Sequence, residues 1–256
     1  MPSFRASKWY LDCVSDSGDV SILYTGRAKW GAFELCYSSI LEEEGGRTAS
    51  RVSFAPEPEP VVSGETASWR SARLAVEGTW RADAEEVRCV LYCCEAGSVE
   101  WRCLMPRATA RIGTCSGLGY VEHLALSVAP WKLPIQTLRW GRFLSSSEWI
   151  VWIEWKGEVS RTVVYRSGRL ERTLAIEDAA IQFADGSRLN MDQTLTIREG
   201  PLGSTALAAL PGVRHSVPGQ ILRTLEHKWR SRARFTGRDG KQAEGWAIHE
   251  RVEWRD

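Results

Sequence analysis

The chain has 256 residues, and its 33 Lys and Arg against 32 Asp and Glu give a formal net charge of +1. Apolar residues make up 43% and charged residues 25%, as in ordinary soluble globular proteins. The near-neutral charge argues against an electrostatic nucleic-acid binder. No apolar run reaches the length of about 18 residues that a transmembrane helix needs.

The seven cysteines and the first residues of the sequence bear on compartment and metal binding. The opening segment lacks the apolar stretch of a secretory signal, and the cysteine count is odd, so we expect free thiols in a cytoplasmic protein. Neither the cysteines nor the four histidines have the spacing of a metal-ligand pair. Nucleotide-binding motifs are absent as well. We therefore predict no metal and no cofactor.

The first element in chain order is a strand around residues 8–14. Its period-two alternation places Tyr10 and Asp12 on one face and Trp9 on the other. Residues 42–65 follow with an acidic run and three closely spaced prolines. Because proline cannot donate a hydrogen bond to a strand ladder, this stretch is predicted to be a long solvated loop.

A later predicted strand carries Tyr120 and Glu122 on its apolar face and His123 on the opposite face. A Pro-Trp-Lys-Leu-Pro segment then forms a stiff connection. We place a domain boundary close to it, which gives domains at residues 1–128 and 129–256. Each half is long enough for a small barrel.

The second half continues the alternating pattern. Further strands are predicted over residues 138–144, 149–155, 224–235 and 246–254. Arg142 shares a face with Trp140, His227 lies on the apolar face of its strand, and Glu250 shares a face with Trp246. Helical periodicity is confined to a short piece at Leu202–Leu210. Many short strands with hairpin turns and almost no helix indicate an all-β barrel or sandwich.

Glu122 is the strongest candidate for chemistry. A carboxyl group on an apolar face favours its neutral form, which could donate a proton as a general acid. A structural alternative is that Arg142, the natural partner of an inward carboxylate, forms an ion pair with Glu122 and only closes the barrel. Both interpretations remain open at this point.

Several segments together resemble a known family. They are Lys8-Trp9-Tyr10-Leu11-Asp12, Gly119-Tyr120-Val121-Glu122-His123, Leu138-Arg139-Trp140-Gly141-Arg142 and Gly245-Trp246-Ala247-Ile248-His249-Glu250. In this order they are similar to motifs of the carotenoid 1,2-hydratase (hydroxyneurosporene synthase) and AttH-like family. The central acid of that family is Asp, where this chain has Glu122.

The resemblance implies two lipocalin-like (calycin) antiparallel β-barrel domains in tandem. It assigns the proton-donating role to Glu122, with Tyr120, His123 and Arg142 around it. Further residues are expected around a bound apolar ligand: Trp9, Tyr10, Asp12, Trp140, Trp246 and Glu250 from these segments, and His227 from the apolar face of its strand. Access to the substrate from a membrane surface is compatible with these expectations, and the oligomeric state is left undefined.

Three functions are compatible with these residues. The leading hypothesis is an enzyme, a hydratase or a cyclase or isomerase, that acts on an isoprenoid or polyene-type substrate with Glu122 as proton donor. The first alternative is a carrier that binds a small apolar ligand without chemistry. The second is a pericyclase that acts mainly through the shape of its pocket, because related lipocalin-like folds also host pericyclases and cyclases and fold alone does not define a reaction.

Overall fold

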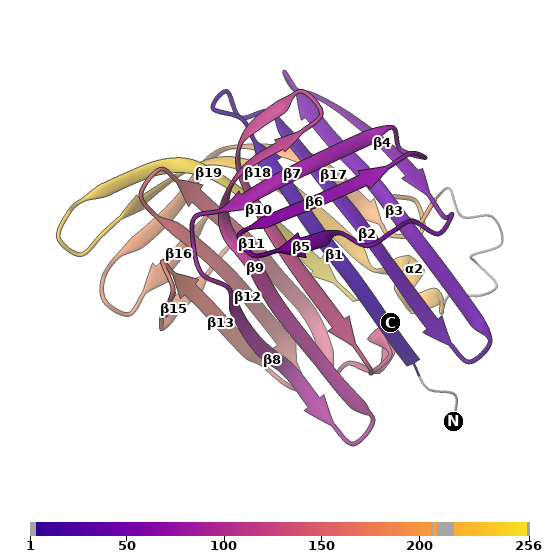
Figure 1. Ribbon diagram of the computed structural model, residues 1–256. Coiled ribbons are helices and arrows are strands. Elements are labelled where there is room, and N and C mark those ends of the chain that lie inside the picture. Colours follow the sequence, from indigo (N-terminus) through magenta and orange to yellow (C-terminus); the bar gives the residue numbers. More distant parts are fainter. Residues whose placement is uncertain (1–3, 206, 209–217, 255–256) are drawn as a thin grey trace. The chain divides into compact units, whose positions relative to one another are not determined.

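The structure is a computed structural model that describes residues 4–205, 207–208 and 218–254. The chain divides into two compact units, Met1–Leu133 (unit 1) and Pro134–Asp256 (unit 2). The division falls after the short 3₁₀ helix Pro130–Lys132, whereas the sequence analysis placed a boundary after residue 128. Each unit is a curled antiparallel sheet, which confirms the all-β prediction (Figure 1).

The described part of unit 1 forms one sheet, ordered β4-β3-β2-β1-β10-β9-β7-β6-β5, with β8 paired to β9. Its strands are β1 (Phe4–Val14), β2 (Val20–Trp30), β3 (Phe33–Glu44), β4 (Arg47–Ser53), β5 (Val61–Ser63), β6 (Thr66–Ser71), β7 (Val76–Ala82), β8 (Val87–Cys94), β9 (Gly97–Ile112) and β10 (Cys115–Leu126).

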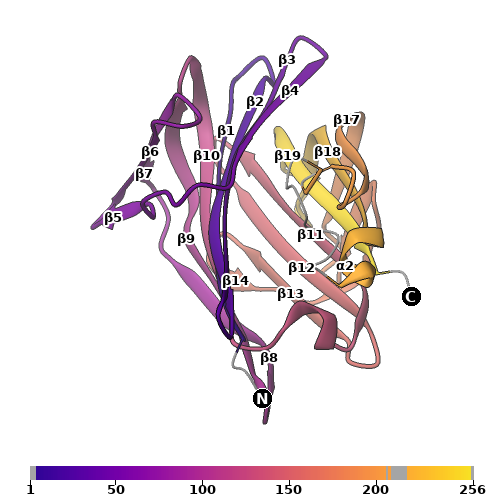
Figure 2. The same ribbon diagram turned by 90° about the vertical axis from the view of Figure 1, so that its right-hand side faces the viewer.

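The sheet of unit 2 is ordered β14-β13-β12-β11-β19-β18-β17-β16-β15, and Figure 2 shows its central strands β12, β11, β19 and β18. Its elements are β11 (Ile135–Ser145), β12 (Trp149–Gly157), β13 (Arg161–Arg166), β14 (Arg169–Leu170), β15 (Thr173–Ile176), β16 (Ala180–Phe183), β17 (Arg188–Pro201), helix α2 (Gly219–Arg223), β18 (Leu225–Thr236) and β19 (Gln242–Glu253).

Nine described strands of each unit follow the same order, and unit 1 has β8 in addition, paired with β9. In each unit the first strand lies between the second strand and the last strand, and the last strand pairs with the strand before it. The residue pairs also correspond: Tyr10 lies opposite Glu122 in unit 1, and Trp140 lies opposite Glu250 in unit 2. The chain therefore contains the same topology twice.

The core of unit 1 forms on one face of its sheet. Alternate residues of the central strands, including Leu11, Leu23 and Val121, pack with Trp69 and Trp80 from β6 and β7, which fold across this face (Figure 1). Full burial of one such side chain contributes about 2–3 kcal/mol. The opposite face of the central strands, defined by Tyr10 and Glu122, is also buried. We call it the Glu122 face.

Two segments differ from their predicted form. Glu42–Glu44 belong to β3, Arg47–Ser53 to β4 and Val61–Ser63 to β5, so the predicted loop is reduced to residues 54–60 and two tight turns at 45–46 and 64–65. Glu43 is buried and accepts a hydrogen bond from the Gly46 backbone, which explains why an acidic run ends a strand here. In the predicted helix Leu202–Leu210, the described residues form turns, while 206 and 209–210 lie outside the described residues.

Candidate functional site

The candidate site lies on the Glu122 face of unit 1, where β1, β10 and β9 are side by side. Tyr10 is opposite Glu122 and Asp12 is opposite Tyr120, so tyrosine and carboxyl side chains alternate across β1 and β10. On the other side of β10, Cys103 is opposite Glu122. The structure thus brings together four residues that the sequence predicted, and it adds a fifth.

Glu122 is held by two neutral donors. The Trp101 indole Nε1 donates a hydrogen bond of 2.6 Å to Glu122 Oε2, and the Tyr120 hydroxyl donates one of 2.8 Å to the same oxygen. Glu122 is 8% exposed. Because one oxygen accepts both hydrogen bonds, the orientation of the carboxyl group is defined, and a proton on the acid belongs on Oε1.

Asp12 makes the same type of contact on the neighbouring strand. The Tyr10 hydroxyl donates a hydrogen bond of 2.9 Å to Asp12 Oδ2, and the Trp80 indole donates one of 2.8 Å to the Asp12 backbone oxygen. Asp12 is fully buried, with 0% exposure. The two Tyr–carboxyl pairs therefore differ in access: only the Glu122 side chain reaches the accessible surface.

The groups beside Glu122 keep their protons near neutral pH. Burial raises the pKa of the Tyr120 hydroxyl well above its usual range, and the neighbouring Cys103 and Glu122 act in the same direction. Burial also raises the pKa of the Cys103 thiol well above its usual range, although the Tyr120 hydrogen bond opposes this shift. Tyr120 therefore acts as a hydroxyl donor, and Cys103 is a neutral thiol.

Two predicted site residues lie on the other face of the same strands. Trp9 packs in the core of unit 1 and lies against the His123 ring, with ring centroids 4.6 Å apart. His123 Nε2 lies 2.9 Å from the Ser7 hydroxyl oxygen, and burial lowers the pKa of this imidazole. The alternation of the strands separates both side chains from Glu122. Their predicted roles in catalysis and ligand binding stay predictions, and the contacts that the structure shows for them are packing contacts.

In unit 2 the position equivalent to Glu122 is Glu250, and it is part of a buried ion network. Lys228 on β18 is fully buried and binds the Glu250 carboxylate. It also lies 3.9 Å from Glu226, which accepts a hydrogen bond of 2.6 Å from Arg198. Breaking such a network is costly because it leaves a buried charge unpaired. Glu250, which was predicted to bind ligand, thus has a structural partner.

The other predicted residues of unit 2 are divided between its two faces. Trp140 shares the Glu250 face, and the Lys228 ammonium lies 5.4 Å from its ring centroid. The fully buried Arg142 also lies on this face, and its Nη1 donates a hydrogen bond of 3.0 Å to the Trp246 carbonyl. Arg142 and Glu122 belong to different units, and their pairing stays a prediction.

The Trp246 side chain is covered by cations rather than exposed to an open apolar space. The Arg230 guanidinium lies 4.8 Å from its ring centroid. His227 lies on the opposite face from Lys228 and Glu250, where it stacks on Trp229 and its Nδ1 is 3.2 Å from a Glu199 carboxylate oxygen. His227 and Glu250 therefore lie on different faces of the sheet, and the ligand-binding role predicted for each stays a prediction.

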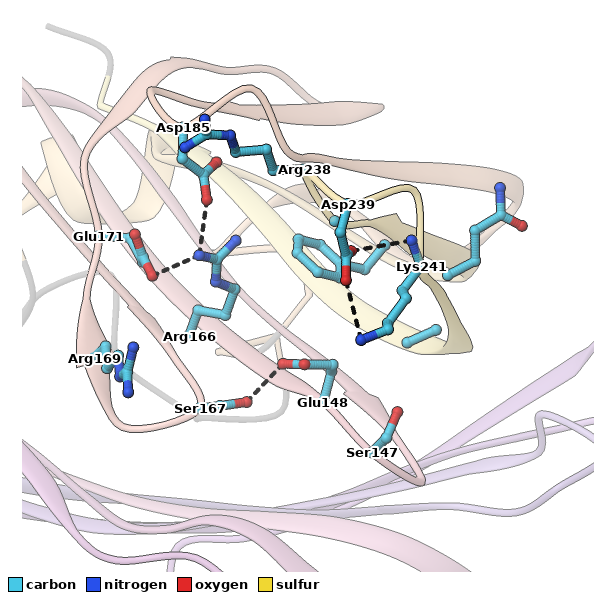
Figure 3. A pocket seen from close by; sticks show the side chains of 14 residues that line it. Ser147, Glu148, Arg166, Ser167, Arg169, Glu171, Asp185, Arg238, Asp239 and Lys241 are labelled. Carbon is cyan, nitrogen blue, oxygen red and sulfur yellow. Dashed lines mark hydrogen bonds and ion pairs between the residues drawn. The ribbon is translucent and has the colours of Figure 1, made fainter.

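A charged pocket of about 800 Å³ lies elsewhere in unit 2 (Figure 3). Arg166 is at its centre, with ion pairs of 2.8 Å to Glu171 and 2.9 Å to Asp185. Burial opposes ionisation of Asp185, but hydrogen bonds from Ser187 and Arg166 lower its pKa to about 2. Cations and carboxylates in this pocket pair with one another. Its lining does not suit the apolar ligand that the sequence predicts.

The sequence analysis missed Trp101, Cys103 and Lys228. The first two follow from pairing β9 with β10, but a register shift beside Val121 moves Cys103 onto the Glu122 face, and simple alternation does not reveal such a bulge. Lys228 was not singled out because charged residues recur on its side of β18, whereas the structure buries it completely opposite Glu250. The sequence signal that could have identified Lys228 is its position opposite Glu250, a glutamate on the apolar side of its strand.

No group of three or more potential metal ligands gathers among the described residues. Within the same residues, no helix has both the length and the hydropathy that a membrane-spanning segment requires.

The two curled antiparallel sheets form a lipocalin-like fold, and solved structures share this fold. CghA aligns with 99% of this chain and 89% of its own, with a TM-score of 0.57 and 11% identity. Kievitone hydratase from Nectria haematococca gives the same coverage, with a TM-score of 0.52 and 10% identity. An AttH-like protein from Nitrosomonas europaea gives a TM-score of 0.51 at 8% identity, over 96% of this chain and 92% of its own.

These likenesses show the lipocalin-like fold that the sequence analysis predicted. A second CghA structure, with Sch210972, aligns with a TM-score of 0.53 and 9% identity over 98% of this chain and 89% of its own. No family model matches the sequence, and no curated protein shows significant sequence similarity to it.

Proposed function

We propose that the protein is an enzyme that binds a small apolar substrate and protonates a carbon–carbon double bond with the Glu122 carboxyl group. The outcome is hydration, cyclisation or isomerisation of an isoprenoid or polyene-type compound. The observation that carries this proposal is the geometry of Glu122: a nearly buried carboxyl group whose orientation is defined by Trp101 and Tyr120.

Access distinguishes Glu122 from Asp12 as the proton donor. A general acid has to come within hydrogen-bonding distance of the reacting atom. Glu122 is 8% exposed, whereas Asp12 is fully buried. Asp12 is therefore a positioning residue, which fixes Tyr10 beside Glu122 through the 2.9 Å hydrogen bond.

The proposed reaction begins when the proton on Glu122 Oε1 moves to one alkene carbon and the π electrons form the new C–H bond. This leaves a carbocation on the neighbouring carbon and a carboxylate at Glu122. Trp101 and Tyr120 already donate hydrogen bonds to Oε2, so they stabilise the negative charge as it forms.

The carbocation then has three fates. A water molecule adds and the resulting oxonium ion loses a proton to give an alcohol, a second double bond attacks to close a ring and the new carbocation then loses a proton, or a neighbouring carbon loses a proton to give an isomer. In each case the released proton restores the Glu122 carboxyl group, so no external oxidant or reductant is needed. The aromatic rings of Tyr10, Tyr24 and Tyr120, which contact one another on this face, suit a carbocation.

The substrate class is inferred from two supports. The motifs around Glu122 resemble those of carotenoid 1,2-hydratases, which implies an isoprenoid alkene. A solved structure with the same fold is described as a hydratase, kievitone hydratase. Hydration is therefore the leading reaction among the three fates.

The test is turnover of a panel of isoprenoid alkenes in D₂O, followed by mass spectrometry. We expect deuterium on carbon in the product of the native protein. Glu122→Gln should reduce the rate about 10²–10⁴-fold, the contribution of a positioned general acid. Glu43→Gln is the matched control, because Glu43 is also a buried glutamate of unit 1 but lies four residues along β3 from Ser39, the register partner of Tyr24 in the row of Glu122.

Other outcomes would contradict the proposal. A product without deuterium on carbon, formed equally fast by Glu122→Gln, would identify a pericyclase. Tight binding of the panel without any product would identify a carrier. Full activity of a folded Glu122→Gln variant would remove the acid role altogether.

A further inference from the structure

An aromatic cluster is exposed at one end of the unit 1 sheet, where β1 begins and β2 turns into β3 (Figure 1). Phe4, Trp30 and Phe33 are register partners in a single row across the three strands. Trp131 packs on this row, with ring centroids 5.5 Å from Phe4 and 5.1 Å from Trp30. We call these four residues the aromatic tip.

The aromatic tip is formed by a tight hairpin. Only Gly31 and Ala32 separate Trp30 from Phe33, and Gly31 has a φ of 60°, which suits the first position of a type II′ turn. Trp30 is 39% exposed and Phe33 is 40% exposed. Large aromatic side chains at the apex of a hairpin contribute little to a core, so their exposure points to a surface that they contact.

Cations surround the aromatic tip. Arg5 and Lys29 are register partners beside it, Lys132 follows Trp131, and all three are exposed. Arg27 and Glu34 form an ion pair of 3.2 Å on the same hairpin. Residues 4–5, 27–34 and 131–132 together contain four cationic side chains and one carboxylate, so their net charge is +3 (4 − 1). The formal net charge of the whole chain is only +1.

The aromatic tip and Glu122 lie on the same face of the sheet. Between them, the next row consists of Ala6, Ala28, Leu35 and Leu126, all half-buried. Tyr10, the partner of Glu122, is six residues from Phe4 along β1, or about 20 Å at the usual rise of a strand. The row after it contains Leu124, Gly26, Tyr37 and the exposed Lys8, so one apolar row and one mixed row separate the tip from the proposed acid on this face.

We propose that the aromatic tip docks unit 1 on an anionic lipid bilayer, from which the apolar substrate reaches Glu122 along this face. The second part rests on the proposed function, whereas the docking itself does not. Tryptophan and phenylalanine prefer the interface between headgroups and acyl chains, and the flanking Lys and Arg are attracted to anionic headgroups. This combination favours a membrane over a second copy of the chain, since two copies would juxtapose the same net charge of +3.

The experiment is co-sedimentation of the full chain with vesicles of phosphatidylcholine alone or mixed with phosphatidylserine. We expect binding to the mixed vesicles that weakens with salt. The double variant Trp30→Ala/Phe33→Ala should reduce the partition coefficient roughly tenfold or more. Lys132→Ala should reduce it about fivefold, the effect of one cation near an anionic surface.

The matched control is Leu170→Ala/Leu174→Ala, which removes two exposed apolar side chains of unit 2, at 66% and 73% exposure. This variant should bind vesicles like the native protein. Thermal unfolding of both double variants verifies that they are folded. If the native protein does not bind mixed vesicles, or if both double variants bind equally well, the docking proposal is wrong.

Two further results separate this proposal from its alternatives. Loss of self-association in the Trp30→Ala/Phe33→Ala variant, without any vesicle binding by the native chain, would show that a second copy covers the tip and would overturn the proposal. Glu122→Gln should bind vesicles normally. A failure of the acid role therefore leaves the docking result unaffected, and a failure of docking leaves the acid role unaffected.

Discussion

Two Tyr–carboxyl pairs lie on neighbouring strands of unit 1, and each tyrosine binds the acid two residues after it. Such pairs fit an antiparallel ladder, because residues i and i+2 share a face and register partners alternate. What differs between the pairs is the third group. Trp101 donates a second hydrogen bond to the side chain of Glu122, whereas Trp80 donates to the backbone of Asp12.

Removing the Tyr120 hydroxyl tests this difference. Tyr120→Phe leaves Glu122 Oε2 with one fewer donor, so we expect a loss of about 1–3 kcal/mol in the free energy of unfolding. Turnover should fall as well, because the carboxylate formed on proton transfer is less stabilised. Tyr10→Phe is the matched variant. We expect it to lose a similar amount of stability but less turnover than Tyr120→Phe. Equal rate losses would contradict the assignment of Glu122 over Asp12.

His249 predicts a pH dependence of stability. Burial lowers the pKa of this imidazole to about 4, Lys228 adds to the effect, and Asp178 opposes it. The unfolded chain takes up the proton below about pH 6.5, but the folded protein does so only near pH 4. Stability is therefore lost as the pH falls from about 6.5 to 4, by about 3 kcal/mol in total.

Denaturant unfolding between pH 7 and pH 4 measures this loss. His249→Asn keeps a polar partner for the Ser231 hydroxyl, which lies 2.9 Å from His249 Nε2, but it does not titrate. We expect a flatter stability profile for this variant, although it is less stable at pH 7. An unchanged acid slope would assign the sensitivity to other groups.

The period-two alternation of the sequence predicted which residues of β1 and β10 share the Glu122 face, but it did not predict which residues of β9 contact them. Tyr10, Asp12, Tyr120 and Glu122 share a face because a strand alternates with period two, which is a local property. Trp101 and Cys103 approach Glu122 through the register of another strand, and a bulge changes that register. Trp9 and His123 were assigned to the site from motif proximity, and the same alternation places them on the opposite face.

At the scale of elements, the close approach of β11 and β12 depends on Gly141. A Cβ atom at this position would lie 2.2 Å from the Trp152 ring and 2.7 Å from His249 Cβ. Trp152 is buried in the core of unit 2, so it cannot move away without disturbing that core. The glycine is required by packing, because its backbone is ordinary strand and only the missing side chain makes room for the indole.

Gly141→Ala should therefore destabilise unit 2 by about 1–3 kcal/mol, the usual penalty for an overpacked core. Chemical denaturation measures the change. In the double variant with Trp152→Phe, the smaller ring relieves the contact, so the two costs should be less than additive. Additive costs would show that the indole does not limit this position.

The strands themselves were largely predictable, because hairpin turns and alternating residues are encoded locally. The turns at Ser17-Gly18 and Asp239-Gly240 separate strands as expected. Glu42–Glu44 were misjudged, since an acidic run normally indicates solvent, but here the Gly46 backbone binds the buried Glu43 carboxylate. The helix expected at Leu202–Leu210 was wrong where the chain is described, and helix α2 follows at Gly219–Arg223.

At the scale of the molecule, each unit has its own hydrophobic core. Independent cores can lose their structure at different free energies. The buried His249 belongs to unit 2, so acid should weaken this unit first. In hydrogen exchange at pH 5, we expect β18 and β19 to lose protection relative to pH 7 more than β1 and β10. A larger loss in β1 and β10 would contradict the assignment of acid sensitivity to His249.

The all-β class and the lipocalin-like fold followed from strand patterning and motif order. The repeated topology was not visible, because the two halves share strand order rather than residues. Tyr10 corresponds to Trp140 and Cys103 to Lys228, and such pairs carry no common chemical signature. Only hydrogen-bonded registers reveal the correspondence.

Because the strand order is duplicated, equivalent positions of the two units can be compared within one chain. A fold present twice can preserve one copy as scaffold while the other accumulates changes that would be harmful in a single copy. Glu250 faces a lysine across the ladder and Glu122 faces a cysteine at the same point. The two glutamates thus differ in their neighbours: Lys228 binds Glu250 in a buried ion network, whereas Glu122 accepts hydrogen bonds from Trp101 and Tyr120. Exchanging the residues at positions 103 and 228 would test whether the side chain opposite each glutamate determines the contacts that this glutamate makes.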